Sequence, residues 1–145
     1  MTKNFLEINN VTFAASAQSK VNNVSLTIEN QGDIVCLLGP SGIGKTTILR
    51  TIAGLEKVQS GKIILKNKIL SSDNIHIEPE NRNISMGFQD NSLFPHYTVL
   101  ENIKFGADRN KKKKKGLNLN EINKLLHIEH IVNKYPHQIS SGEAQ

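Results

Sequence analysis

Apolar and polar residues alternate in two stretches near the start of the chain. FLEINNVTF (5–13) and VSLTI (24–28) follow the period of two that is typical of half-buried strands, and we predict that they pair. QGD (31–33) is a turn signal, and IVCLL (34–38) after it is a continuous apolar run. Such a run predicts a strand that is buried on both faces.

The apolar spacing changes after this run. A helix that stops at Gly54 is predicted because apolar residues recur at helical spacing, namely Ile48, Leu49, Ile52, Ala53 and Leu55. Strands are predicted again at 61–70 and 84–88, with the polar stretch 71–83 as a loop between them. This part of the chain therefore indicates a mixed sheet with at least one helix.

Beyond Phe94-Pro95 the composition shifts towards helix formers. Helices are predicted at 98–106 and 119–135, separated by the run Lys111–Lys115. The five charges of this run equal the whole net charge of +5, and we expect a solvated, disordered loop because like charges repel. A nucleic-acid patch is disfavoured, since no aromatic residue is interleaved with the lysines. Attraction to an anionic membrane surface stays open as an alternative.

The composition is that of one modest soluble domain of 145 residues, with 37% hydrophobic residues. The longest apolar run is far too short to span a membrane, and the first residues carry no secretion signal. Cys36 is the single cysteine and lies in the apolar run, so we expect a buried, inert thiol and no internal disulfide. These features favour a reducing, cytoplasmic setting.

The stretch GPSGIGKT (39–46) fits the phosphate-loop pattern, with a predicted strand before it and a helix after it. Glycines let the backbone curl around a phosphate with its N–H groups inward, and the helix directs its positive end at the same anion. We expect Lys45 to reach the β- and γ-phosphates, Thr46 to ligate Mg²⁺ and Thr47 to lie near the α-phosphate. The candidate ATP-binding residues are Gly39, Pro40, Ser41, Gly42, Ile43, Gly44, Lys45, Thr46 and Thr47. A chance match in a linker is disfavoured by the flanking elements.

The loop alone does not choose between a kinase, a GTPase and a transport ATPase. Two later stretches narrow the choice: GFQDNSLFPHYTVLENI (87–103) places Gln89 directly after a predicted strand, and ISSGEAQ (139–145) has Ser and Gly where a helix can begin. With these three stretches in this order, the chain resembles the nucleotide-binding subunits of ABC transporters. Residues 39–46 look like their Walker A loop, Gln89 like their Q-loop glutamine, and ISSGEAQ like a variant of their LSGGQ signature.

The resemblance implies an α/β fold of the P-loop nucleotide hydrolase type found in ABC ATPases, with an antiparallel β subdomain, the start of a helical subdomain and an incomplete core. Residues 1–38 and 56–88 would form the β-rich core and the antiparallel subdomain. Residues 39–55 would form the phosphate loop and its helix, and 89–145 the Q-loop and the helical subdomain up to the signature.

The resemblance also implies roles for the later motifs. Gln89 would contact Mg²⁺ or the attacking water and sense the γ-phosphate; an ordinary exposed polar residue is the alternative. The signature of one subunit would contact ATP held by the other, through Ser140, Ser141, Gly142 and Glu143, with Ser140 donating to the γ-phosphate. Ser141 and Glu143 depart from the family pattern, and a carboxylate near triphosphate is unfavourable. A simple helix N-cap, with a serine and a downstream acid, is the alternative for this segment.

Three further residues or segments bear on partners and substrate. Ala15 stands where the family usually stacks adenine on an aromatic residue, and we expect the nearby Phe13 to belong to the packing face of its strand. The Leu93–Thr98 turn is a candidate socket for a membrane subunit, with an internal core contact as the alternative. His127 and His130 are three apart, but without carboxylates in a set spacing we do not take them as iron ligands.

Within the family, residues 77–106 look most like importer subunits of the group that serves ferric iron, polyamines, sulfate and sugars, with ferric iron nearest. The resemblance implies ATP and Mg²⁺ as cofactors, and it implies permease membrane subunits and a second ATP-binding subunit, in a homodimer, as partners. It implies no nucleic acid. The expected location is peripheral, at the cytoplasmic face of the plasma membrane.

The chain ends at Gln145, directly after the signature-like stretch. No apolar run ends in Asp-Glu, so no general base can be nominated, and the strand expected beside 34–38 is missing. We therefore expect a fragment with exposed apolar surface on that run and negligible ATP hydrolysis by this chain alone. The open alternatives are a soluble P-loop kinase, a non-catalytic nucleotide-binding remnant, and a soluble ABC protein that acts on DNA or ribosomes.

Overall fold

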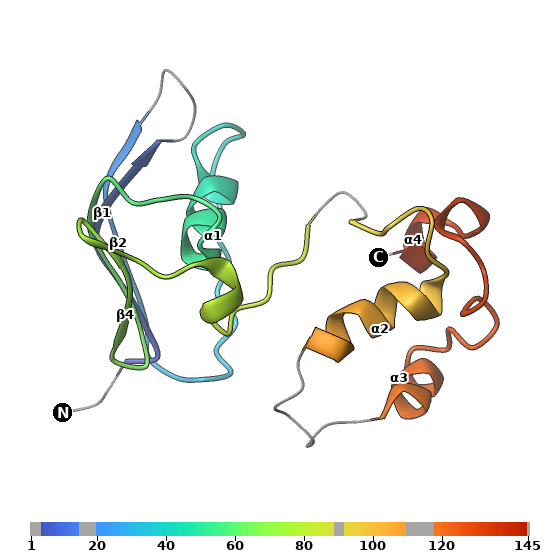
Figure 1. Ribbon diagram of the computed structural model, residues 1–145. Helices are drawn as coiled ribbons and strands as arrows, with labels where there is room; N and C mark the ends of the chain where they lie inside the picture. Colours follow the sequence, from blue (N-terminus) through green and yellow to red (C-terminus); the bar gives the residue numbers. More distant parts are fainter. Residues whose placement is uncertain (1–3, 15–19, 89–91, 110–117, 145) are drawn as a thin grey trace. The chain divides into compact units, whose positions relative to one another are not determined.

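The computed structural model describes residues 4–14, 20–88, 92–109 and 118–144, with the backbone alone for 106–109. The chain divides into two compact units, Met1–Gly87 and Phe88–Gln145 (Figure 1). In the described part of the chain, no helix combines the length and the apolar character needed to cross a bilayer.

The first unit is built on an antiparallel sheet with the strand order β2-β1-β3-β4-β5. Its strands are β1 (Leu6–Ala14), β2 (Lys20–Ile28), β3 (Ser60–Leu65), β4 (Lys68–Ser72) and β5 (Ile75–His76). The predicted pairing of the first two strands is confirmed, with Leu6 opposite Ile28 and Phe13 opposite Val21. The stretch 71–83 is not only a loop, because it holds the end of β4, all of β5 and a 3₁₀ turn, η1 (Pro79–Asn81).

Helix α1 (Lys45–Ala53) follows the Gly-rich loop and lies along one face of the sheet (Figure 1). One face of β1 packs with this helix, and a register shift after Ile8 keeps Val11 on that face. The core is made of Leu6, Ile8, Val11, Phe13, Ile48, Ile63 and Leu70. Phe13 is 1% exposed, which confirms that its ring belongs to the packing face. Gly54 ends the helix with φ +91°, the left-handed conformation that glycine adopts without steric cost, as its position predicts.

The predicted single strand 61–70 is wrong, since β3 and β4 form a hairpin there. Lys66 and Asn67 make its two-residue loop, with φ +49° and +65°. Positive φ at both central residues is the mark of the tight turn whose twist matches the flanking strands, and asparagine tolerates that conformation.

The predicted strands 34–38 and 84–88 are absent: neither run has regular secondary structure. Ile34 and Leu38 are 98% and 88% exposed, and Cys36 is exposed rather than buried. A strand forms when neighbours satisfy its backbone N–H and C=O groups, and the described strands pair only with one another. The expected exposure of apolar surface on 34–38 agrees with these values.

The second unit is helical, with α2 (Val99–Arg109), α3 (Leu119–Leu125), a 3₁₀ turn η2 (Pro136–Gln138) and α4 (Ser141–Ala144). The predicted helix 119–135 ends ten residues early. His127 takes φ +55°, and the N–H groups of His127 and Ile128 bond back to the carbonyls of Lys124 and Asn123. This is the Schellman arrangement that closes a helix, and histidine is among the residues that tolerate its left-handed position.

Candidate functional site

The Gly-rich loop 39–44 owes its course to glycines at positive φ. Gly39, Gly42 and Gly44 have φ values of +153°, +80° and +102°. A Cβ added at Gly42 would meet nothing within 4 Å, so crowding by the protein is not the reason for glycine there. The reason is the backbone conformation, which L side chains rarely adopt.

Lys45 begins α1 and folds its side chain back over the loop. Its Nζ donates to the carbonyl oxygens of Gly39 at 2.8 Å and Pro40 at 2.7 Å. An ammonium has three donors, so these two bonds leave one donor for an acidic or phosphate oxygen. The two carbonyls thus hold the positive charge against the loop.

The start of α1 offers N–H groups to the same region. Its N-cap is Gly44, which supplies no side-chain hydrogen bond, and its first turn contains no acidic residue. The N–H groups of a first helical turn have no acceptor within the helix, and the helix dipole makes this end positive. Thr46 is exposed in this first turn. The loop, Lys45 and the threonines that the sequence nominated therefore adjoin one another at the start of α1. The arrangement suits a phosphate group.

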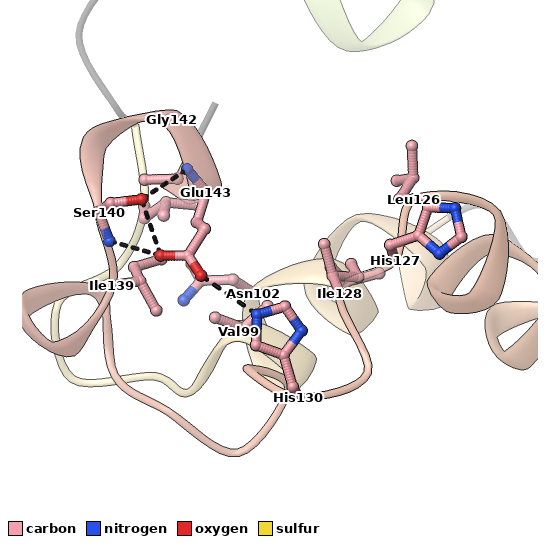
Figure 2. Close-up of a pocket in the computed structure, with 13 residues that line it drawn as sticks. Val99, Asn102, Leu126, His127, Ile128, His130, Ile139, Ser140, Gly142 and Glu143 are labelled. Carbon is pink, nitrogen blue, oxygen red and sulfur yellow. Dashed lines mark hydrogen bonds and ion pairs between the residues drawn. The ribbon is translucent and has the colours of Figure 1, made fainter.

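The second nominated segment begins helix α4, and Ser140 is its N-cap. The Ser140 N–H and hydroxyl both donate to Glu143 Oε2, at 2.8 and 2.7 Å, and the Glu143 N–H lies 3.3 Å from Ser140 Oγ (Figure 2). This reciprocal pattern is a capping box, the alternative that the sequence left open for this segment. Ser141 is the first helical residue, and Gly142 faces open space.

The Glu143 carboxylate is the electrostatic centre of this segment. Donation from the backbone N–H and then from the hydroxyl of Ser140 holds the pKa of Glu143 below its usual value, and His130 adds to the shift. The imidazole Nε2 of His130 lies 3.3 Å from Glu143 Oε1 (Figure 2). The sequence nominated the Ser140 hydroxyl to donate a hydrogen bond to phosphate. In the structure this hydroxyl donates instead to a charged carboxylate of its own helix.

A cavity of about 750 Å³ adjoins this segment within the helical unit. Its walls are mainly apolar and include Leu93, Val99, Ile103, Leu126, Ile128 and Ile139. His130 and Glu143 contribute polar atoms at one side (Figure 2).

The Leu93–Thr98 turn is held from inside its own unit. The ring of Phe94 packs on Phe105 and Tyr97, with centroids 4.7 and 5.4 Å apart. Asn102 accepts from the Phe94 N–H, and its amide donates to the carbonyls of Phe94, Tyr97 and Thr98. The internal contact is therefore present, although Phe94 remains 38% exposed.

Sequence reasoning missed two residues that organise these regions, Asn102 and the buried Arg82. An asparagine inside a predicted helix and an arginine inside a predicted loop both look like ordinary solvated positions, so no local signal distinguishes them. Ala15, Gln89 and the Lys111–Lys115 run lie outside the described residues, and the predictions for them stay predictions.

Comparisons with known proteins identify what this chain resembles. A family model described as ABC transporter matches residues 21–145. The putrescine transport ATP-binding protein PotG of Escherichia coli is 42% identical over 142 residues, which are 97% of this chain and 36% of that protein. The spermidine/putrescine import ATP-binding protein PotA of Nitrosospira multiformis is 41% identical over 145 residues, 97% of this chain and 38% of that protein. The chain thus spans little more than a third of the length of these relatives.

Solved structures give the same picture of the fold. The ATP-binding cassette MJ0796, in a post-hydrolysis dimer bound to ADP and Pi, is 26% identical with a TM-score of 0.72, over 96% of this chain and 65% of that one. The cassette MJ1267 is 23% identical with a TM-score of 0.75, over 97% of this chain and 61% of that one, which bears on the fold alone. These likenesses confirm the predicted fold class.

Proposed function

The chain belongs to the ABC transporter family, and on that premise we propose that it binds Mg²⁺·ATP through residues 39–47 as the ATP-binding part of a solute importer. The observation that carries the proposal is the position of Lys45, whose ammonium is fixed over the Gly-rich loop at the uncapped start of α1. A triphosphate there would gain the lysine charge, the loop N–H groups and the helix dipole together.

The roles of the metal ligands go beyond the described geometry. Thr46 would ligate Mg²⁺ through its hydroxyl, and Gln89 would contact the ion or the attacking water. Support comes from the place of Thr46 in the first turn of α1, beside Lys45. Mg²⁺ would supply the charge that neutralises the β- and γ-phosphate oxygens.

The transported solute would be a small ion or metabolite of the importer group. PotG and PotA are named for putrescine and spermidine, and the sn-glycerol-3-phosphate import protein UgpC of Bartonella bacilliformis is 39% identical over 127 residues, 86% of this chain and 35% of that protein. We favour a polyamine on this ground, in place of the ferric iron that the sequence suggested, because none of these three relatives is named for iron.

The partners would be permease membrane subunits and a second copy of the ATP-binding subunit, with peripheral association at the cytoplasmic face of the membrane. In that dimer Ser140 and Gly142 of one copy would approach ATP held by the other. The dimeric form of the MJ0796 cassette supports this assembly. Because the Ser140 hydroxyl donates to Glu143 in the capping box, this bond would have to break before Ser140 donates to ATP.

Isothermal titration of the 145-residue chain with Mg²⁺·ATP tests the proposal. Lys45→Ala should weaken binding by at least about tenfold, because it removes a charge-assisted hydrogen bond to phosphate. Lys62→Ala is the matched control, since Lys62 is exposed on β3 and has no part in the loop. Equal affinity of wild type and Lys45→Ala, or the absence of binding by the wild-type chain, would overturn the proposal.

A further inference from the structure

Arg82 is a buried cation without a carboxylate partner within hydrogen-bonding distance in the described structure. It is 1% exposed, and burial lowers the pKa of its guanidinium, while Glu78 raises it. A buried charge is costly unless its donors are satisfied. Here neutral acceptors satisfy them: the carbonyls of Thr51, Ile52 and Ile77, the Ser71 hydroxyl and His76 Nδ1.

Two of these acceptors are the last-turn carbonyls of α1. Arg82 Nη1 lies 3.0 Å from Thr51 O and 2.9 Å from Ile52 O. The final carbonyls of a helix carry its negative end, so a cation is stabilised there. Thr51 O accepts the Gly54 N–H as well. The guanidinium therefore caps α1 from outside the helix.

The remaining bonds tie this cap to the sheet. Nη2 donates to Ser71 Oγ of β4 at 2.7 Å, and Nε donates to the carbonyl of Ile77, just after β5, at 2.6 Å. Arg82 thus joins the C-terminal end of α1 to one edge of the sheet. A planar guanidinium with several fixed donors sets the orientation of both partners, which an ammonium does less well.

Gly54 makes the close approach of helix and guanidinium possible. A Cβ on Gly54 would lie 2.4 Å from Arg82 Nε and 2.8 Å from its Cζ. Gly54 also needs its left-handed φ to end the helix. The helix end and the guanidinium therefore fit together only with glycine at this position.

Helix α1 has nine residues, so its first turn lies about 12 Å from the capped end. Because a helix moves as a rigid element, an anchor at one end limits where the other end can lie. The other end carries Lys45 and the free N–H groups beside the Gly-rich loop. Ile48 and Thr51 are buried between the two ends, so the whole helix is held against the sheet.

We propose that Arg82 is a positioning residue for the nucleotide site: by anchoring the C-terminal end of α1 to β4, it holds Lys45 and the first helical turn where they bind phosphate. The inference rests on the proposed binding of ATP by residues 39–47. Arg82 itself would touch no nucleotide and acts through the helix.

The test compares Arg82→Met and Arg82→Lys with Arg50→Met in the 145-residue chain. Arg50 is the matched control because it lies on the same helix and its guanidinium forms a partly exposed ion pair with Glu56 at 3.1 Å. Affinity for Mg²⁺·ATP is measured at a temperature at which circular dichroism shows each variant folded. Backbone amide exchange of residues 48–50, the first amides of α1 that are bonded within the helix, is measured without nucleotide.

Arg82→Met should weaken ATP binding by about tenfold or more, since small misplacements of binding groups are costly. It should also speed exchange in the first turns of α1, far from the altered side chain. Arg82→Lys should recover part of both effects, and Arg50→Met should stay within about twofold of wild type. A folded Arg82→Met chain with wild-type affinity and wild-type exchange would overturn the inference.

If the Arg82→Met variant does not fold, two milder variants are tested in its place. Ser71→Ala removes one acceptor of the guanidinium, and Arg82→Lys keeps the charge; wild-type affinity and exchange in both would overturn the inference. Failure of the wild-type chain to bind ATP refutes the proposed function instead. The anchor is then judged by exchange alone, which needs no nucleotide, and unchanged exchange in the variants overturns it as well.

Discussion

The hydroxyl of Ser140 donates to the carboxylate of Glu143 across 2.7 Å, so the serine that the family resemblance assigns to a phosphate is engaged within its own helix. The same carboxylate accepts the Ser140 N–H and contacts His130. For Ser140 to donate to ATP of a second subunit, this hydroxyl bond has to break. The acid that stabilises the start of α4 therefore competes with the proposed role of its N-cap.

Glu143→Gln should strengthen Mg²⁺·ATP-dependent self-association of the chain. Glutamine keeps an acceptor oxygen for the capping box but removes the negative charge. A unit charge about 4 Å from another contributes about 1 kcal/mol in water, so we expect a gain of about fivefold, measured by sedimentation velocity with and without nucleotide. Glu101→Gln is the control, because Glu101 and Thr98 form the same capping box at the start of α2. Equal association of Glu143→Gln and wild type would contradict the competition.

The capping box of α4 should lose its stabilising contribution at a pH below the ordinary pKa range of a carboxyl group. Hydrogen bonds from Ser140 place the folded-state pKa of Glu143 below its ordinary value of 4.5. The stabilising contribution is therefore present above pH 4.5 and is lost as the pH falls through the lowered value. NMR titration of the Glu143 carboxyl carbon and the Ser140 amide measures this midpoint. Ser140→Ala should raise it towards 4.5, and a midpoint at or above 4.5 in the wild type would contradict the assignment.

Gly54→Ala should destabilise the first unit more than Gly32→Ala does. Both glycines have positive φ, +91° and +103°, but a Cβ at Gly32 meets nothing within 4 Å, whereas one at Gly54 meets the Arg82 guanidinium. We expect about 1 kcal/mol of backbone strain at Gly32, and about 3 kcal/mol at Gly54 because crowding adds to strain. Urea unfolding of the two variants measures the difference. An equal loss of unfolding free energy in the two variants would show that the Arg82 guanidinium moves aside without an energetic cost.

The 145-residue chain should hydrolyse ATP at a negligible rate. No apolar run of this sequence ends in Asp-Glu, so the sequence nominates no general base, and we expect that bound ATP would not be attacked efficiently by water. Phosphate release measured with wild type and Lys45→Ala should give the same background rate. A substantial rate that disappears in Lys45→Ala would contradict this prediction.

Much of the candidate site follows from the sequence because its bonds are local. The Gly-rich loop, the helix behind it and the Gly54 stop depend on backbone conformation over a few residues. Ser140 with Glu143 pairs a cap residue with an acid three positions on, and that pattern is legible in the sequence. The alternation in β1 and β2 likewise marks one apolar face, which the structure buries in β1 and partly buries in β2. The missed hairpin at Lys66-Asn67 is also local, a turn signal read as strand.

The tertiary structure decided the features that depend on distant partners. IVCLL has the composition of a buried strand, yet no described strand pairs with it, and its side chains are exposed except that of Leu37, which is partly buried against the core. Arg82 looks like a solvated loop residue, yet it is buried because acceptors from α1, β4 and the segment after β5 converge on it. A residue's own chemistry sets which bonds it can make, whereas burial and pairing depend on what the rest of the chain brings near it.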